Sequence, residues 1–544
     1  MIVDNDYSFI FSSFELMPDF FFQGYCYINN DLIMDYEGAI LYPHSIKPFN
    51  DGCYFTLFKE QERYILGVDS NGFNKLYIYS SNGIWAVSNS IYNLAKFLHS
   101  KNIRLTSNYS VLASLFNINT VSNQISTLST VFNEIKLVPH EAYLEVLDNV
   151  ISVKPKQHME DKGYIGNLQR YVEIWISRIE TLIVNDKIHI TSELTGGIDS
   201  RVVYSLFYAA LTRLGIEKPK KVHFRSSKDE RYRADLSCAT RIVDRYKGEL
   251  NIKFESKRFK MAHDKAYQKW KDLNLGGYSP IYMPTWELYD DTIHFGGGGG
   301  EVHRSQYGRR ELLTFAKGQK NHILRMFSVG QNFDLEELLD NYVFNMLVDV
   351  HEVGSYASNN NIHPLVLHYR EFRNRYHAGR SPQYGRTVAP LGSDYLTACS
   401  SFCEIEKLNS NQILYDIMES LCPGLSTMPY DMESKFPSYD SIKSINIIPF
   451  SKESNPGKIY KNLNKETYDK DLKDYKTPYF SFLKYEINDF IKNYDNKFFT
   501  EGYVKNVLDF MDQSIENKRF SHAAKASSVA HLLIYKMMLD FAES

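Results

Sequence analysis

The sequence predicts a chain of two parts: an α+β amino-terminal part, then an α/β part with a parallel sheet and a helical carboxy-terminal end. Residues 1–160 alternate short apolar and aromatic runs with turn residues, as in CYFTLF, RYILGV, KLYIYS and GIWAVS, a pattern typical of strands. After ISVKPKQHMEDKG, residues 161–544 change to longer helical stretches such as IGNLQRYVEIWISRIETLI. A strand, a glycine-rich turn and a helix follow in succession, as a doubly wound domain requires.

The composition is that of a large globular protein. With 544 residues, of which 43% are hydrophobic and 23% charged, the chain is long enough for two or more packed domains. The formal net charge of −3 provides no basic field that would attract a polyanion. We therefore expect a small molecule as the ligand and no nucleic acid as a partner.

The cysteines and the amino terminus bear on the cellular compartment. Among the six cysteines only Cys399 and Cys403 are close in sequence, and no second pair completes a zinc site. The start, MIVDNDYSFIF, has no basic leader before an apolar core, and no apolar run reaches the roughly 18 residues of a membrane-spanning helix. We expect reduced, buried thiols in a cytoplasmic protein without a membrane span.

The sharpest motif lies in the second half, where the strand KIHITSEL runs into TGGIDS and then into the helix RVVYSLFYAALTRL. A glycine-rich turn at a helix start presents unpaired backbone N–H groups and the positive end of the helix to an anion. The alternative is a plain turn that caps the helix through Asp199 or Ser200. The residues expected to hold a nucleotide phosphate here are Leu194, Thr195, Gly196, Gly197, Asp199 and Ser200.

The TGGIDS segment resembles the SGGxDS pyrophosphate loop of the asparagine synthetase family. Further pieces continue the likeness in order: FNDGCY, GVDSNGFNKLY and AVS, and then IKLVPH, which resembles the turn that closes the family's amino-terminal domain. The resemblance implies a class II glutaminase sandwich of the Ntn amidotransferase type over residues 1–160. It also implies an ATP-pyrophosphatase domain, of the adenine-nucleotide α-hydrolase type, over residues 161–544.

One departure from the family concerns the glutaminase nucleophile. Glutamine-hydrolysing members carry a cysteine directly after the initiator methionine, but here position 2 is Ile2 and the first cysteine is Cys26. Removal of Met1 cannot expose an amino-terminal thiol. The resemblance therefore implies a vestigial domain, as in β-lactam synthetases, lasso-peptide cyclases and polysaccharide-cluster relatives. The amine or ammonia must then come from elsewhere.

A second nucleotide element is expected at VHFRS, a short strand followed by the charged run KDERYRAD. In the family, the corresponding strand end receives adenine through backbone hydrogen bonds. Phe224 and Arg225 would then line the adenosine pocket. The alternative is a buried strand followed by a solvated charged loop.

A third element is the glycine run 296–300, followed by EVHRSQY. Five glycines at a strand end form a backbone anion nest, and the run resembles the family's G-E-G-x-D-E magnesium loop. The resemblance assigns Gly298 and Gly299 to the nucleotide, and Glu301 with Asp199 to Mg²⁺. The family's aspartate position falls on Gly300, which leaves Glu301 as the sole carboxylate of the loop. A flexible linker is the alternative.

Amide formation needs a base for the amine and a cation for the charge that develops. The helical segment LHYREFRNRY contains Tyr369 and Glu371, a pair like the base of β-lactam synthetases. Lys435 is a candidate cation, with Lys452 and Lys458 as alternatives. An ordinary charged helix explains the same segment equally well.

The function implied is that of an ATP- and Mg²⁺-dependent ligase that adenylates a carboxylate, releases pyrophosphate and transfers the acyl group to an amine or ammonia. The carboxylate can belong to a small molecule, a sugar acid or a peptide. Amidation of a uronic acid in capsule or O-antigen assembly is one alternative, and peptide cyclisation is less favoured. A nucleotide-binding or regulatory homologue that has lost the chemistry is another. The oligomeric state stays open, a homodimer included.

Overall fold

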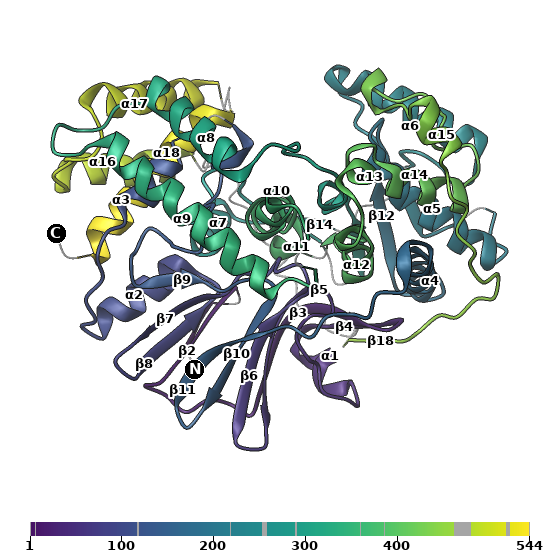
Figure 1. The fold of residues 1–544 in the computed structure, drawn as a ribbon, viewed down its shortest axis with the longest axis horizontal. Coiled ribbons are helices and arrows are strands. Elements are labelled where there is room, and N and C mark those ends of the chain that lie inside the picture. The colour runs from purple at the N-terminus through teal and green to yellow at the C-terminus, as the bar shows by residue number, and fades with distance from the viewer. Residues whose placement is uncertain are drawn as a thin grey trace.

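The computed structural model describes residues 2–5, 7–116, 119–217, 219–252, 258–284, 286–288, 291–359, 361–385, 387–461, 480–517 and 523–542. Two sheets built mainly from the first 155 residues lie at the bottom of Figure 1, and the carboxy-terminal helices gather at the upper left. A smaller parallel sheet and its helices lie at the upper right.

The two amino-terminal sheets pack face to face. Phe9 and Phe11 from one sheet and Phe55 and Leu57 from the other are buried in a shared apolar cluster, which is how a sandwich buries the inner faces of both sheets. The five-stranded sheet is antiparallel, with the order β1 (Ile2–Asn5), β2 (Ser8–Ser12), β8 (Ile84–Ser88), β7 (Tyr77–Ser81) and β9 (Ile135–Leu137).

The seven-stranded sheet is antiparallel except at one edge, where β18 runs parallel to β4. Because β18 comes from the far end of the chain, this edge ties the two halves together. The order is β11 (Val150–Pro155), β10 (Ala142–Leu147), β6 (Arg63–Val68), β5 (Asp51–Glu60), β3 (Phe20–Ile28), β4 (Asp31–Met34) and β18 (Ile459–Tyr460). Three helices belong to this part of the chain: α1 (Asp35–Leu41), α2 (Ile91–Ser100) and α3 (Tyr109–Ser114).

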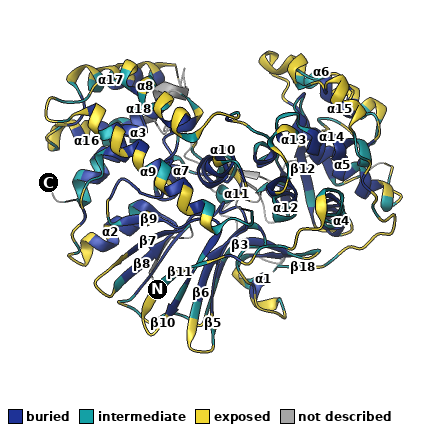
Figure 2. Cartoon of the chain, viewed as in Figure 1, coloured by how far each residue is buried: buried dark blue, intermediate teal, exposed yellow. Residues whose placement is uncertain are grey.

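The second half contains a four-stranded parallel sheet in the order β13 (Val222–Arg225), β12 (His189–Glu193), β16 (Thr292–Phe295) and β17 (Thr387–Val388). Strand β12 and helix α5 (Ile198–Arg213) are largely buried (Figure 2). Helix α5 packs against α4 (Gly163–Ile183) and α14 (Gln412–Leu421). Further helices of this half are α6 (Arg233–Arg245), α12 (Asp394–Ser401), α13 (Ile405–Asn409) and α15 (Tyr439–Lys443).

The remaining helices form the helical part of the fold. Helix α8 packs on α9, α16 and α17 pack on α18, and α3 packs on α9. A π-helix, η4, continues directly from α10. The bounds are α7 (His263–Asn274), α8 (Leu312–Met326), α9 (Leu335–Tyr356), α10 (Pro364–His368), η4 (Tyr369–Ala378), α11 (Arg380–Tyr384), α16 (Phe480–Asn493), α17 (Glu501–Glu516) and α18 (Ala523–Phe541). Strands β14 (Arg258–Lys260) and β15 (Trp286–Leu288) form a separate two-stranded antiparallel sheet.

The fold is thus α/β, with mixed sheets, a parallel sheet and a helical carboxy-terminal half. Strand β11 ends at Pro155 and α4 begins at Gly163, on either side of the boundary expected near residue 160. One apolar cluster nevertheless includes Tyr27 and Trp175 from opposite sides of that boundary, so the division into domains stays a prediction. In the described ranges no helix has the length and apolar character that crossing a membrane requires.

Candidate functional site

The loop Leu194–Gly197 connects β12 to α5 and is held by its own side chains. Thr195 Oγ1 lies 3.0 Å from Ser200 Oγ, and the Gly197 N–H donates to Thr195 Oγ1 at 3.1 Å. The Leu194 N–H donates to Arg225 O at 2.8 Å, which extends the β12–β13 pairing by one residue. The hydroxyl groups of Thr195 and Ser200 therefore fix the shape of the turn.

Two carboxylates that sequence reasoning does not predict lie against Gly196. Its N–H donates to Asp235 Oδ1 at 2.8 Å, and a Cβ on Gly196 would lie 2.5 Å from Asp431 Cβ. The glycine is needed because Asp431 leaves no space for a side chain. Asp235 occupies a backbone donor of the loop, at the helix end where an anion binds favourably.

The loop lies at the topological switch point of the parallel sheet. From β12 the chain passes through α5 to β13 on one side, and β16 pairs with β12 on the other side. In open α/β sheets, ligands bind outside the carboxyl ends of the strands at such a point. A cavity of about 480 Å³ lies here, and six of the predicted residues line it: Thr195, Gly197, Asp199, Ser200, Gly298 and Glu301.

The glycine run after β16 is shaped by close backbone approach. Gly299 has a φ of +92°, and a Cβ there would lie 2.6 Å from Gly392 N. A Cβ at Gly297 would lie 3.0 Å from Asp199 Cβ. The run is thus an ordered turn packed between α5 and the turn at Gly392, which argues against the flexible-linker reading.

Asp199, Arg304 and Glu301 form the charged centre of the cavity. Arg304 Nη2 lies 2.6 Å from Asp199 Oδ2 and 4.0 Å from Glu301 Oε1. Asp199 Oδ1 is buried and makes no hydrogen bond within the described residues. A Cβ at Gly300 would overlap this Oδ1 atom. The missing loop aspartate thus has a steric reason, because Asp199 occupies the space that a side chain at position 300 would need.

The pKa values follow from this arrangement. The pKa of Asp199 is raised to about 6. Burial is the main cause, Glu301 acts in the same direction, and Arg304 opposes both. Burial would lower the pKa of Arg304, but Asp199 and Glu301 together raise it. At neutral pH the Asp199–Arg304 pair is therefore ionised, because the pKa of Asp199 lies at about 6 and that of Arg304 is raised.

These residues fit a magnesium ion that arrives with phosphate. The described part of the chain has no group of three or more His, Cys, Asp or Glu side chains placed to hold a metal. Mg²⁺ usually binds through one or two carboxylates together with substrate phosphates. Asp199 Oδ1 and the Glu301 carboxylate supply that number of ligands.

Lys435 lies at the rim of the same loop. Its Nζ makes an ion pair with Asp431 at 2.7 and 2.9 Å from the two carboxylate oxygens, and the Asp431 N–H donates to Gly196 O at 3.4 Å. Arg201 of α5 holds this segment by donating to Met428 O at 2.9 Å and to Pro429 O. Lys435 is therefore close to the nucleotide loop, whereas Lys458 lies on the β4 edge beside Asp31.

Tyr369 and Glu371 do not come together. Tyr369 is buried, its ring centroid lies 5.1 Å from that of Tyr307, and burial with the nearby Glu301 charge raises its pKa. Glu371 is fully buried in an ion pair with Arg375, and its Oε2 lies 2.6 Å from His140 Nδ1. The expected catalytic pair is not formed because the two side chains leave η4 toward different neighbours.

Phe224 and Arg225 are not among the residues that line the cavity. The Phe224 ring is buried and packs against the rings of Tyr204 and Phe207, at centroid distances of 5.0 and 5.7 Å. Its carbonyl accepts the Asn251 N–H at 2.9 Å. The Phe224 side chain is therefore that of a buried strand and does not line this cavity, and its place in an adenosine pocket stays a prediction.

Sequence reasoning also missed the cavity wall formed by residues 377–382. Arg380 lies over the ring of Tyr282 at 3.9 Å from its centroid, and its buried Nη1 has no hydrogen-bond partner in the described ranges. His377 Nδ1 lies 3.0 Å from Tyr278 Oη. Burial, with Arg373 and Arg380 nearby, lowers the pKa of His377 to about 3. The wall thus offers a guanidinium and a neutral imidazole.

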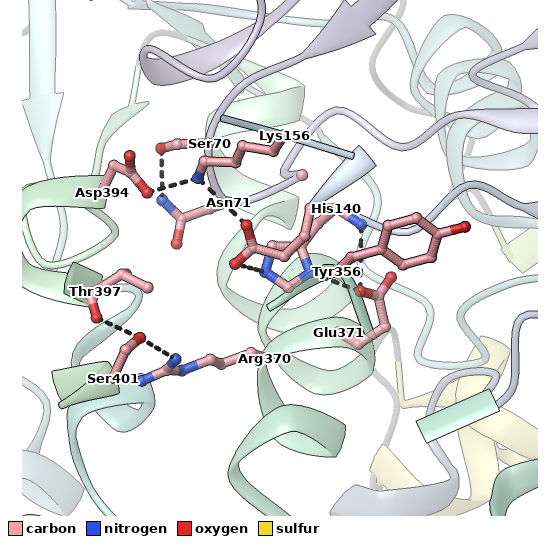
Figure 3. A network of polar contacts seen from close by, with 12 residues as sticks. Ser70, Asn71, His140, Lys156, Tyr356, Arg370, Glu371, Asp394, Thr397 and Ser401 are labelled. Atoms are coloured by element: carbon pink, nitrogen blue, oxygen red, sulfur yellow. Dashed lines mark hydrogen bonds and ion pairs between the residues drawn. The ribbon is translucent and has the colours of Figure 1, made fainter. Parts of the chain in front are cut away.

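A second polar centre joins the amino-terminal sheets to the second half (Figure 3). It is a chain of alternating charges, most of them buried, that runs in the order Arg375, Glu371, His140, Glu141, Lys156 and Asp394. Lys156 Nζ lies 2.6 Å from Asp394 Oδ1 and 3.5 Å from Glu141 Oε2. Asp394 begins α12, and the turn before it packs on Gly299, so this chain of charges is linked to the glycine run beside the cavity.

The comparisons with known proteins leave the family open. No protein-family model matches the chain, and no curated protein matches it. One matching solved structure is the glutamine phosphoribosylpyrophosphate (PRPP) amidotransferase from B. subtilis complexed with ADP and GMP, at 7% sequence identity and a TM-score of 0.11. The match covers 50% of this chain and 46% of that chain, so it spans less than half of the other protein. The resemblance to asparagine synthetases remains a hypothesis based on sequence motifs.

Proposed function

We propose that this protein is an ATP-dependent ligase that activates a carboxylate as its adenylate and joins it to an amine or ammonia. The observation that carries the proposal is the single cavity at the sheet's switch point. It is lined by Thr195, Gly197, Asp199, Ser200, Gly298 and Glu301, although two sequence segments about 100 residues apart supply them. Hydroxyls and carboxylates that converge at the amino terminus of a helix suit a polyphosphate with its cation.

In the first step a carboxylate oxygen attacks the α-phosphorus of ATP. The bond between that phosphorus and the bridging oxygen breaks, and pyrophosphate leaves. The loop residues would hold the departing pyrophosphate through backbone N–H groups, and Arg380 and Lys435 would offset its charge. Asp199 and Glu301 would hold Mg²⁺, which supplies charge neutralisation on the phosphates when bound.

In the second step the amine nitrogen attacks the acyl carbon, loses a proton, and AMP leaves. Tyr369 is a poor candidate for the base because its raised pKa keeps it protonated at neutral pH. Glu371 is occupied by Arg375 and His140. The polar wall at His377–Pro382 is the better place to search for groups that bind the acceptor.

The amino donor would be free rather than released from glutamine by this chain. Position 2 is Ile2. Cys26 and Cys53 of the amino-terminal sheets are buried, and burial raises the pKa of both thiols. Neither can serve as an exposed thiolate nucleophile. The proposal therefore predicts ammonia or an amine substrate as the nucleophile, with uronic acid amidation and peptide or amino-acid cyclisation as the specific reactions to compare.

A nucleotide-binding protein without ligase activity is the second candidate. Two contacts favour it. Arg304 forms an ion pair with Asp199, and Asp235 accepts a hydrogen bond from the Gly196 N–H. Both would have to yield to a phosphate–magnesium complex. If these contacts persist, a nucleotide could bind at the cavity without productive alignment of its α-phosphate.

A pyrophosphate-release assay separates the two candidates. The purified protein is incubated with ATP, Mg²⁺ and ammonia against a panel of uronic acids, amino acids and short peptides, alongside Asp199→Ala. The ligase proposal predicts release that depends on one class of acid and is lost in the variant. ATP binding with no release for any acid would support the non-catalytic candidate and overturn the ligase.

A further inference from the structure

Cys399 and Cys403 form an adjacent pair of thiols at the carboxyl end of α12. The two cysteines are four residues apart, a spacing that brings side chains together at a helix end, and Cys399 Sγ lies within reach of both the Cys403 sulfur and Tyr164 O, the latter at 3.9 Å. The turn between them is closed by the Phe402 N–H, which donates to Cys399 O at 3.3 Å. Cys403 follows the end of α12 at Ser401, so its backbone is not held in the helical hydrogen-bond ladder.

The pair is accessible from a cavity that is separate from the nucleotide site. A cavity of about 550 Å³ has Cys403 in its wall, together with His363, Ser401 and Glu404. Cys403 is half-buried, whereas the other five cysteines are all buried. A small oxidant can therefore reach Cys403 from this cavity, whereas the Cys399 thiol is buried.

The surroundings also favour a thiolate at Cys403. The hydrogen bond from Cys399 lowers the pKa of Cys403 most strongly, burial opposes this, and the nearby Lys407 and Arg370 lower it further. For Cys399 the hydrogen bond to Cys403 and burial both raise the pKa. The pKa of Cys403 is thus lowered and that of Cys399 raised. A thiolate beside a thiol is the arrangement of an attacking cysteine with its resolving cysteine.

We propose that Cys399 and Cys403 are a redox-sensitive dithiol that hydrogen peroxide converts to a disulfide. The Cys403 thiolate attacks one peroxide oxygen, the O–O bond breaks, and a sulfenic acid forms as hydroxide leaves and takes up a proton. The Cys399 sulfur then attacks the sulfenic sulfur, the S–O bond breaks, and the second water leaves. The two thiols lose two electrons in total, and the peroxide gains them.

The disulfide would act on the nucleotide cavity through Ser400. Ser400 Oγ lies 3.0 Å from His303 Nδ1 and accepts a hydrogen bond from Arg370 Nη2 at 2.8 Å. His303 lies in the short 3-10 helix η3 (Gly300–His303), which carries Glu301. A disulfide between Cys399 and Cys403, which lie on either side of Ser400 in the sequence, would shift the contact between Ser400 and His303. The segment that carries Glu301 would move with it. This coupling rests on the proposed function, whereas the thiol chemistry stands without it.

The experiment treats the full-length protein with hydrogen peroxide, alkylates the remaining thiols, and maps the peptide 387–407, which contains both cysteines. We expect that neither cysteine of this peptide is alkylated and that the peptide is lighter by the mass of two hydrogen atoms. Dithiothreitol should reverse both changes. Cys403→Ser should abolish the reaction, and Cys399→Ser should stop it at a sulfenic acid that dimedone labels. Cys238→Ser is the matched control and should react as the wild type does.

Persistent alkylation of both thiols in wild-type protein at peroxide concentrations that oxidise free cysteine would overturn the dithiol. Because this result needs no variant, it holds even if a serine variant fails to fold. Calorimetry with ATP then tests the coupling: the oxidised protein should bind ATP about fivefold more weakly than the reduced protein. Equal affinities would overturn the coupling to the nucleotide loop. Absence of ATP binding in the reduced protein would contradict the proposed function instead.

Discussion

Arg304 Nη2 lies 2.6 Å from Asp199 Oδ2, and this ion pair lies at the centre of the cavity. Binding of a magnesium–phosphate complex must rearrange it, because the carboxylate would turn to the cation and the guanidinium to the phosphate. The nucleotide of the proposed function would therefore act directly on this pair. Several measurable consequences depend on it.

Asp199→Asn keeps the size of the side chain and removes its charge. We expect pyrophosphate release to fall by about 100-fold or more, because a preorganised group at the reacting phosphates is lost. The protein should stay folded, since Asn still accepts a hydrogen bond from Arg304. The matched control is Asp186→Asn, an exposed carboxylate beside Lys221, which should leave the rate unchanged. Equal rates for the two variants would contradict the role of Asp199.

The pH dependence of activity follows from the pKa of Asp199, about 6. The carboxylate must be ionised to hold Mg²⁺, so activity should fall as the pH drops through about 6. The effect on stability has the opposite sign. From about pH 4 to 6 the folded state binds more protons than the unfolded state, because the pKa of Asp199 is raised on folding. The contribution of Asp199 to the free energy of unfolding therefore falls as the pH rises through this range. The measurement is a pH–rate profile of the wild type. The rate that remains in Asp199→Asn should lack the inflection, and an unchanged inflection would assign it to another group.

Gly300→Ala tests the steric relation between positions 300 and 199. The added methyl group would overlap Asp199 Oδ1, so the ion pair with Arg304 should be displaced and ATP affinity should fall at least tenfold. Gly318→Ala is the control, because a Cβ there meets nothing within 4 Å in helix α8. That change should stabilise the helix by about 1 kcal/mol. Titration calorimetry and thermal unfolding measure both effects, and full affinity in Gly300→Ala would show that the loop has spare room.

Glu371→Gln distinguishes a structural carboxylate from a catalytic one. Breaking the buried contacts with Arg375 and His140 should destabilise the protein by about 3 kcal/mol, because charges remain buried without a partner. The turnover number of the folded fraction should change little. Glu352→Gln, at an exposed position of α9, is the matched control for charge removal. A large loss of turnover at unchanged stability would restore Glu371 as a catalytic residue.

The raised pKa of His140 predicts that the protein becomes less stable at alkaline pH. Burial would lower its pKa, but Glu371 and Glu141 raise it to about 9. Because the folded-state pKa exceeds the unfolded value, the contribution is complete below pH 6.5 and is lost as the pH rises through 9. Urea unfolding of wild type and His140→Asn between pH 6 and 10 measures it. The difference in unfolding free energy should shrink across that range, and a constant difference would contradict the charged state of His140.

The sequence predicted what is local. The Thr195–Ser200 turn, its strand and its helix are encoded in adjacent residues, so glycine placement and periodicity were enough to locate them. Gly298 and Glu301 were assigned to the same site through the resemblance of the glycine run to the family's magnesium loop. They line the same cavity because β12 and β16 are parallel and end at one edge of the sheet. The fit of Asp199 against Gly300 was not predictable, because it depends on the packing of two loops.

Long-range polar contacts account for most of the errors. Tyr369 and Glu371 were proposed as a base because the pair resembles that of β-lactam synthetases, but the partner of Glu371 is His140, which lies 231 positions away. Positions 369 and 371 are two residues apart, a spacing that does not bring side chains together on a helix. Phe224 was assigned through the resemblance of its strand, and a short apolar run does not reveal which of its faces is buried.

The most direct test of the central claim is calorimetric titration with α,β-methylene-ATP in the presence of Mg²⁺, since this analogue binds without being cleaved between its α- and β-phosphates. We predict one binding site with a dissociation constant below about 1 mM. Asp199→Ala should weaken binding at least tenfold, and Asp186→Asn should not. Absence of binding heat at several temperatures, with folded protein, would contradict a nucleotide site at the Thr195–Ser200 loop.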